Sequence, residues 1–113
     1  MGKMQRDKGC RWERAVAAMF REALPGEDIR RGWQARSGSD EPDVIVPGWW
    51  VEAKVGKAPP LMRALRQAQE AAEGDALKRT PIAVVKQDRC EPVVLLALDD
   101  FLALLGDWYE RGK

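Results

Sequence analysis

Histidine is absent from this chain. Without an imidazole there is no Ser-His-Asp triad, no Cys-His nucleophile, no histidine-based nuclease site and almost no basis for a zinc site. Any hydrolysis must therefore use carboxylates, lysine and a hard metal ion with oxygen ligands.

Cysteine and long apolar segments are also scarce. Cys10 and Cys90 have no CxxC spacing, which fits a reducing cytoplasm, with a single Cys10–Cys90 disulfide as the alternative. No segment resembles a signal peptide or a transmembrane span, because the longest apolar runs are only a few residues. We therefore expect a cytoplasmic protein with no membrane partner.

The composition predicts one compact domain over residues 1–113, with 45% hydrophobic and 33% charged residues. The net charge of +1 hides a gradient, since residues 1–36 contain nine Lys/Arg and five Asp/Glu, whereas residues 90–113 contain two and five. A basic N-terminal third suggests a face that meets a polyanion. An ordinary solvated helix surface would account for the charge equally well.

The central motif is a β-hairpin predicted over residues 43–55, with a turn at Pro47-Gly48. Proline suits the first central position of a tight turn, and glycine tolerates a positive φ at the second. A two-residue loop pairs Val46 with Trp49. A longer loop would shift this register by about one residue.

With the two-residue loop, Asp43 lies directly opposite Glu52, where like charges destabilise a strand pair. Lys54 follows Glu52 by two residues and shares its face whichever register holds. Two carboxylates and one ammonium then project from an otherwise apolar hairpin. A divalent cation is the natural compensation for the carboxylates.

A helix is predicted from Gly9 to Leu24, after a mobile basic arm at residues 1–8. Its apolar stripe comprises Trp12, Val16, Met19, Phe20 and Ala23. Glu13 falls at the edge of this stripe, where a carboxylate is costly unless it is solvated, paired or bound to metal. Pairing with a nearby Arg or Lys is the alternative to metal binding.

Residues 28–36 read as an arginine-rich strand. Arg30, Arg31 and Arg36 could contact phosphates or pair with neighbouring acids. The Ser37-Gly38-Ser39 turn that follows could hold a phosphate through its hydroxyls and amides, although such turns are more often plain loops.

The second half predicts a helix over 61–73, buried strands over 81–86 and 92–98, and a helix over 100–109 capped by Asp99. The last helix has more apolar residues than one core-facing stripe needs, which indicates either core packing or a dimer surface. The order of elements is α-β-β-β-α-β-β-α. We expect an α/β fold with a mixed central β-sheet flanked by helices.

These residues together resemble the PD-(D/E)XK nuclease superfamily, and within it the small archaeal and phage Holliday junction resolvases. The resemblance covers roughly residues 8–98 and rests on Gly9, Glu13-Arg14, Ser37-Gly38-Ser39, Pro42-Asp43, Glu52-Ala53-Lys54 and Gln67. It implies a restriction-endonuclease-like fold and a homodimer that nicks four-way DNA junctions symmetrically with Mg²⁺, for which Mn²⁺ substitutes. It also implies a bacterial, archaeal or phage-infected cell.

The resemblance assigns roles to individual residues. Asp43 and Glu52 would be metal ligands together with the backbone carbonyl of Ala53, and Glu13 would complete the acidic cluster directly or through water. Lys54 would orient or activate the attacking water and stabilise the charge that develops on the phosphate.

The remaining implied roles concern the loop, the second helix and the DNA. Ser37 or Ser39 matches the family's loop serine near the scissile phosphate, and Gln67 or Gln69 matches its helical glutamine. The basic residues expected to contact DNA are Lys3, Arg6, Lys8, Arg11, Arg14, Arg30, Arg31, Arg36 and Lys57.

Two other functions compete with junction resolution. One is a restriction-type or repair nuclease that uses the same motif. The other is a non-catalytic DNA-binding or interaction module whose acidic hairpin is only structural. A chain of 113 residues has little room for a sequence-reading domain, which favours recognition of DNA shape.

Overall fold

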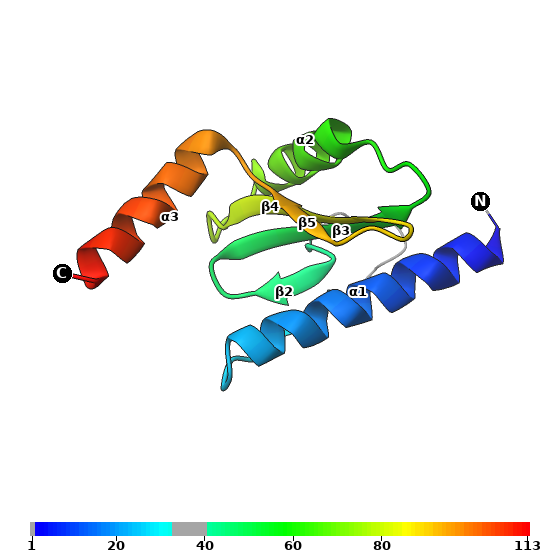
Figure 1. The fold of residues 1–113 in the computed structure, drawn as a ribbon, viewed down its shortest axis with the longest axis horizontal. Coiled ribbons are helices and arrows are strands. Elements are labelled where there is room, and N and C mark those ends of the chain that lie inside the picture. Colours follow the sequence, from blue (N-terminus) through cyan, green and yellow to red (C-terminus); the bar gives the residue numbers. More distant parts are fainter. Residues whose placement is uncertain (1, 33–40) are drawn as a thin grey trace.

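The computed structural model describes residues 2–32 and 41–113. It is an α/β fold with a five-stranded mixed sheet and three helices (Figure 1). The elements are α1 (Lys3–Ala23), β1 (Arg30–Arg31), β2 (Val44–Val46), β3 (Trp49–Gly56), α2 (Leu61–Ala72), β4 (Thr80–Gln87), β5 (Val93–Leu95) and α3 (Leu98–Arg111). The predicted order of elements is confirmed.

The strands lie side by side in sequence order, β1-β2-β3-β4-β5. Only β3 and β4 are parallel, because α2 carries the chain back across the sheet between them. Helix α1 packs on one face, where Val16 meets Val51 and Ala53, and α2 packs on the other, where Ala64 meets Ala83. Even-numbered residues of β3, including Glu52, therefore face the α2 side.

The predicted hairpin register is confirmed. Val44 pairs with Val51, Ile45 with Trp50 and Val46 with Trp49. Gly48 has φ +85°, the left-handed conformation that the second turn position requires of glycine.

The first helix begins earlier than predicted, at Lys3. The expected arm is therefore wrong for residues 3–8, which are helical. The buried residues of α1 are Trp12, Val16 and Ala17, whereas Met19 is 43% exposed. The predicted stripe was displaced because Ala17, not Met19, faces the sheet.

Two corrections concern the C-terminal region. The stretch 92–98 was expected to be a buried strand, but β5 is short and exposed, with Val94 at 54% exposure. Helix α3 starts at Leu98, and Asp99 lies in its first turn instead of capping it. No residue of α3 is buried, and the helix projects away from the sheet (Figure 1). β5 stays exposed because α3 does not fold back over it.

In the arginine-rich stretch, only Arg30 and Arg31 lie in a strand among the described residues. Arg36, Ser37 and Ser39 fall outside the described residues, so their predicted roles are untested. Cys10 and Cys90 are free thiols. Among the described helices, none is both long and apolar enough to cross a membrane.

Candidate active site

The hairpin end carries the acidic residues that the sequence singled out. Strand pairing of β2 stops at Val44, and one residue earlier the carboxylate of Asp43 accepts a hydrogen bond from the Ala53 N–H at 2.9 Å. A strand residue directs its N–H and C=O to the same edge, so the Ala53 carbonyl is directed to the Asp43 side as well.

The backbone before Asp43 is held by a close approach to β1. The Gly32 N–H donates to the Asp43 carbonyl at 2.8 Å. A Cβ at Gly32 would clash with the Pro42 carbonyl oxygen, and Pro42 is fully buried. Only glycine fits here, and it lets the chain after β1 approach the backbone of Pro42 and Asp43.

Asp43 raises the pKa of both other acids in the predicted cluster. Burial, followed by the charge of Asp43, raises the pKa of Glu52 to about 7, against hydrogen bonding from Trp50 and the charge of Lys54. Burial and then Asp43 also raise the pKa of Glu13, against the neighbouring Arg31. Asp43 is therefore near enough to repel both Glu52 and Glu13, although Glu13 comes from the helix on the opposite face of the sheet.

Glu13 is paired with Arg31, which is the alternative that the sequence left open. Its Oε1 accepts hydrogen bonds from Arg31 Nε at 3.0 Å and Nη2 at 2.8 Å, and its side chain is only 15% exposed. Arg31 Nη2 also contacts the Cys10 sulfur at 3.4 Å. Arg31 is therefore engaged with Glu13 and Cys10, and its predicted DNA contact stays a prediction.

Within residues 2–32 and 41–113, no group of three or more Asp, Glu or Cys side chains is arranged to hold a metal ion. The Glu13 carboxylate is paired with Arg31 of β1. Asp43 and Glu52 remain the pair of carboxylates on which the site is built.

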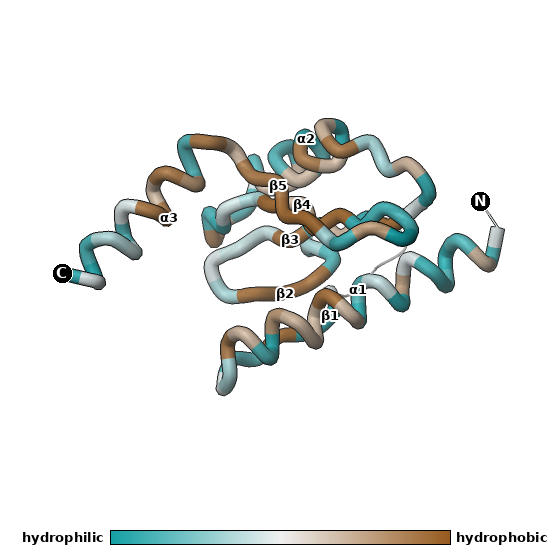
Figure 2. Tube along the Cα trace, viewed as in Figure 1, coloured by the Kyte–Doolittle hydropathy of each residue, from teal (hydrophilic) through white to brown (hydrophobic). Residues whose placement is uncertain are grey.

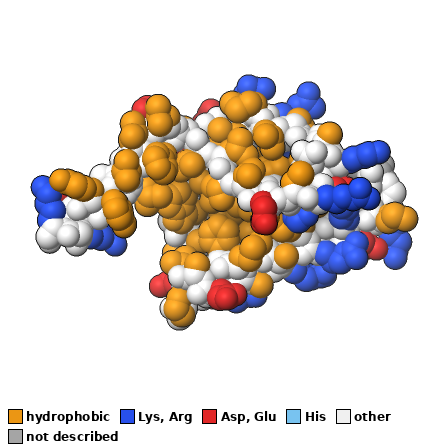
Figure 3. Space-filling view, in the orientation of Figure 1, with side chains coloured by type: hydrophobic (Ala, Val, Ile, Leu, Met, Phe, Trp, Pro, Cys, Tyr) orange, Lys and Arg blue, Asp and Glu red, His pale blue; other side chains and the backbone are white. Residues whose placement is uncertain are grey.

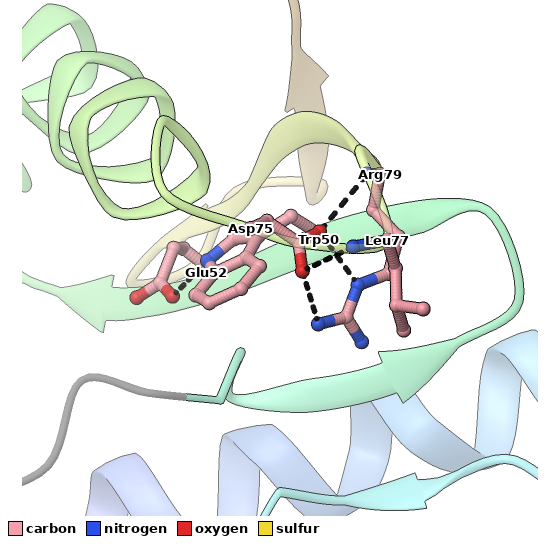
Figure 4. A network of polar contacts seen from close by, with 5 residues as sticks. All are labelled: Trp50, Glu52, Asp75, Leu77 and Arg79. Carbon is pink, nitrogen blue, oxygen red and sulfur yellow. Dashed lines mark hydrogen bonds and ion pairs between the residues drawn. The ribbon is translucent and has the colours of Figure 1, made fainter.

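A polar network that the sequence did not reveal holds Glu52 in place (Figure 4). Trp50 is 2% exposed, and its indole N–H donates to Glu52 Oε2 at 3.0 Å. The Arg79 guanidinium lies over the Trp50 ring, 5.0 Å from its centroid. Asp75 binds Arg79 through two hydrogen bonds of 2.9 and 3.0 Å, and those bonds lower the pKa of Asp75.

This network ties the loop between α2 and β4 to the carboxylate on β3. Trp50 could have been found from its spacing, since it lies two residues before Glu52 and shares its face. Arg79 and Asp75 could not, because nothing in the sequence places their loop over β3.

We expect Trp50→Phe to destabilise the protein by about 1.5–3 kcal/mol above pH 7, since a hydrogen bond to a charged group contributes this much. The ionised Glu52 carboxylate would lose its buried donor, so its pKa would rise further. Urea denaturation at pH 8 measures the effect. The same comparison at pH 5, where Glu52 is protonated, isolates the packing cost; equal losses at both pH values would refute the anchoring role.

Two further predicted residues have different surroundings. Lys54 lies on the Glu52 face of β3, and its charge lowers the pKa of Glu52, as expected of a neighbouring ammonium. The side chain of Gln67 is on the exposed side of α2, and Gln69 is half-buried. The role implied for Gln67 stays a prediction.

Three of the predicted DNA-contacting residues, Lys3, Arg6 and Lys8, lie in the first turns of α1, at one end of the molecule. Lys and Arg side chains cover the end that carries the start of α1 and the turn between β4 and β5 (Figure 3). Lys8 Nζ on α1 forms an ion pair of 2.8 Å with Asp88 Oδ1 in the turn between β4 and β5. Lys86 and Arg89 lie near the same carboxylate. The sequence analysis missed Lys86 and Arg89 because their proximity to α1 is a tertiary feature.

The exposed residues among those predicted to contact DNA fall into two groups. Lys3 pairs with Asp7 at 3.5 Å and Arg30 with Asp28 at 3.9 Å, both as exposed ion pairs of the kind that contribute little stability. The second group consists of the exposed residues Arg6, Arg11, Arg14 and Lys57.

No family model, curated protein or solved structure matches this chain. The functional argument therefore depends on the geometry of the hairpin and its charged neighbours.

Proposed function

We propose that this protein is a metal-dependent, structure-selective DNA endonuclease with a restriction-endonuclease-like fold, of the PD-(D/E)XK type, that resolves four-way junctions by paired nicks. The observation that supports it best is the hydrogen bond of 2.9 Å from the Ala53 N–H to the Asp43 carboxylate, which holds Asp43 next to Glu52. Burial and then the charge of Asp43 raise the pKa of both Glu52 and Glu13. Asp43 repels one acid from the hairpin and one from the helix, and the charge of Lys54 acts on Glu52. Such mutual repulsion is costly in a purely structural role.

The residues fit a hard divalent cation. Asp43, Glu52 and the Ala53 carbonyl supply the oxygen ligands that Mg²⁺ prefers, and Mg²⁺ keeps several waters, so few protein ligands suffice. Glu13 would act through water, because Arg31 holds its carboxylate. When bound, the metal polarises the scissile phosphate and favours a deprotonated water.

The chain's own residues supply the rest of the chemistry. Lys54 is placed to orient the attacking water and to stabilise negative charge on the phosphate. Trp50 fixes the orientation of Glu52, so the ligand geometry is set before DNA binds. The basic end, together with Arg11 and Arg14 exposed on α1, would hold the DNA backbone without reading bases.

Cleavage of a synthetic mobile four-way junction, resolved on a denaturing gel, tests this function directly. Flaps and plain duplex of the same sequences are the matched substrates, each with Mg²⁺, Mn²⁺ or no metal. We expect symmetric nicks in the junction with either metal and none without. Preferred cleavage of flaps or duplex would indicate a repair- or restriction-type nuclease instead.

A non-catalytic DNA-binding module is the second candidate, and the Glu13–Arg31 pair favours it because the pair already neutralises one acid of the cluster. Titration of Mg²⁺ against tryptophan fluorescence separates the two functions, since Trp50 donates directly to Glu52. A module without a metal site would give no saturable response and no cleavage.

Arg14→Ala should weaken junction binding and reduce the salt slope of log Kd by about 1, as loss of one phosphate contact does. Arg14 is exposed in the middle of α1, and its charge lowers the pKa of Glu13. Fluorescence anisotropy across a range of KCl concentrations measures the slope. Lys113→Ala, at the far end of the molecule beyond α3, is the charge-matched control and should leave the slope unchanged.

A further inference from the structure

Helix α3, strand β5 and the end of α1 form one apolar surface around a groove. The groove has a volume of about 510 Å³ and is lined from the body by Phe20, Trp49, Ile82 and Val94, and from α3 by Phe101 and Leu104. Hydrophobic side chains gather over this hollow between α3 and the body (Figure 3), and the apolar residues continue along α3 (Figure 2). Exposed apolar surfaces of this extent mark interaction sites.

An isolated α3 is a poor candidate for a stable helix in water. It has 14 residues and none of them is buried, whereas isolated helices of about 12–15 residues are marginal and take their stability from packing. The surface therefore needs a partner that covers the apolar arc of α3.

We propose that this surface binds a second copy of the chain, with the two α3 helices antiparallel across a two-fold axis near Leu105 and each lying over the partner's groove. Area supports a second copy. Eight large apolar side chains from Val94 to Tyr109 are 42% to 69% exposed. Three of them are aromatic, and at about half of the 150–250 Å² that an aromatic side chain buries, with smaller areas for Val and Leu, the eight offer on the order of 600 Å² of apolar surface per copy. A standard interface takes about 800 Å² from each partner, of which about 60% is apolar.

Charge supports the antiparallel two-fold arrangement. At 100° per residue, Asp100 and Arg111 lie about 20° apart, on the same flank of the apolar arc. A two-fold axis brings the same flank of both helices together. Asp100 of one copy then faces Arg111 of the other when the axis passes near Leu105. Asp107, the other acid on this flank, lies opposite Leu104 instead of another carboxylate.

Sedimentation equilibrium of the full chain, without DNA or metal, tests the proposal independently of nuclease activity. We expect a dimer at micromolar concentration, and a monomer for Leu105→Asp with the α/β body still folded, because α3 contributes no buried residue to the core. A wild-type chain that stays monomeric at 100 times that concentration overturns the proposal.

A charge swap tests the register. Asp100→Arg alone and Arg111→Asp alone should each weaken dimerisation at least tenfold through like-charge contact across the axis. The double variant Asp100→Arg with Arg111→Asp should return the dissociation constant to within about threefold of wild type. A double variant whose dimer dissociates as readily as those of the single variants overturns the antiparallel pairing.

Discussion

Asp43→Asn should lower the rate of junction cleavage by at least about 100-fold, the scale of loss when a main electrostatic group is removed from an active site. Asp43 lies one residue before β2, accepts a hydrogen bond from Ala53 and interacts with both Glu52 and Glu13. An amide keeps the size and the acceptor for the Ala53 N–H but removes the charge that a divalent ion needs. Single-turnover cleavage with Mg²⁺ measures the change.

Junction binding by Asp43→Asn should stay within about threefold of wild type, because phosphate contacts dominate nucleic-acid affinity and a carboxylate makes none of them. Asp28→Asn is the matched control. Asp28 is exposed before β1 and pairs only loosely with Arg30, at 3.9 Å, so its substitution should affect neither quantity. Parallel loss of binding and cleavage in Asp43→Asn would contradict a catalytic role.

The hairpin could be predicted because its determinants are local. A Pro-Gly turn and strict alternation fix which residues pair, and the structure has that register. The same alternation placed Glu52 and Lys54 on one face. The place of Glu13 at the edge of the predicted stripe indicated a carboxylate that needs a partner, and the structure pairs it with Arg31.

The surroundings of the acids could not be predicted, since they depend on contacts between distant segments. Arg31 reaches Glu13 across 18 positions, and Lys8 reaches Asp88 across 80. Arg79 lies over Trp50 only because α2 returns its loop to the start of β4. The sequence shows that these residues are charged, but it does not show which distant residue each of them contacts.

The fate of the C-terminal third shows a second limit. Its apolar runs predicted that residues 92–98 are buried. In the structure β5 is an exposed edge strand, and α3 projects away from the sheet. Periodicity shows that a face is apolar, not whether its own chain or another molecule covers it. The sequence left core packing and a dimer surface open for α3, and the exposed helix favours the second.

Glu52→Gln should stabilise the protein above pH 7 while removing cleavage. In the folded protein the pKa of Glu52 is raised from 4.5 to about 7, so the folded state holds a proton that the unfolded state releases. Stability from this group is complete below about pH 4.5 and is lost as pH rises through 7. A neutral amide avoids that loss, which amounts to about 3 kcal/mol for such a shift.

Urea denaturation of both proteins at pH 5 and pH 8, without metal, measures the effect. The free energy of unfolding of Glu52→Gln relative to wild type should increase between pH 5 and pH 8 by up to about 3 kcal/mol. Added Mg²⁺ should stabilise wild type at pH 8 and leave Glu52→Gln nearly unchanged, because binding to the native state raises stability only where the ligands exist. If the difference in free energy of unfolding between the two proteins does not change with pH, the pKa of Glu52 is not raised in the folded state. Since the cost of ionising Glu52 is what a bound cation would relieve, the case for a metal-dependent nuclease would then lose its main electrostatic support.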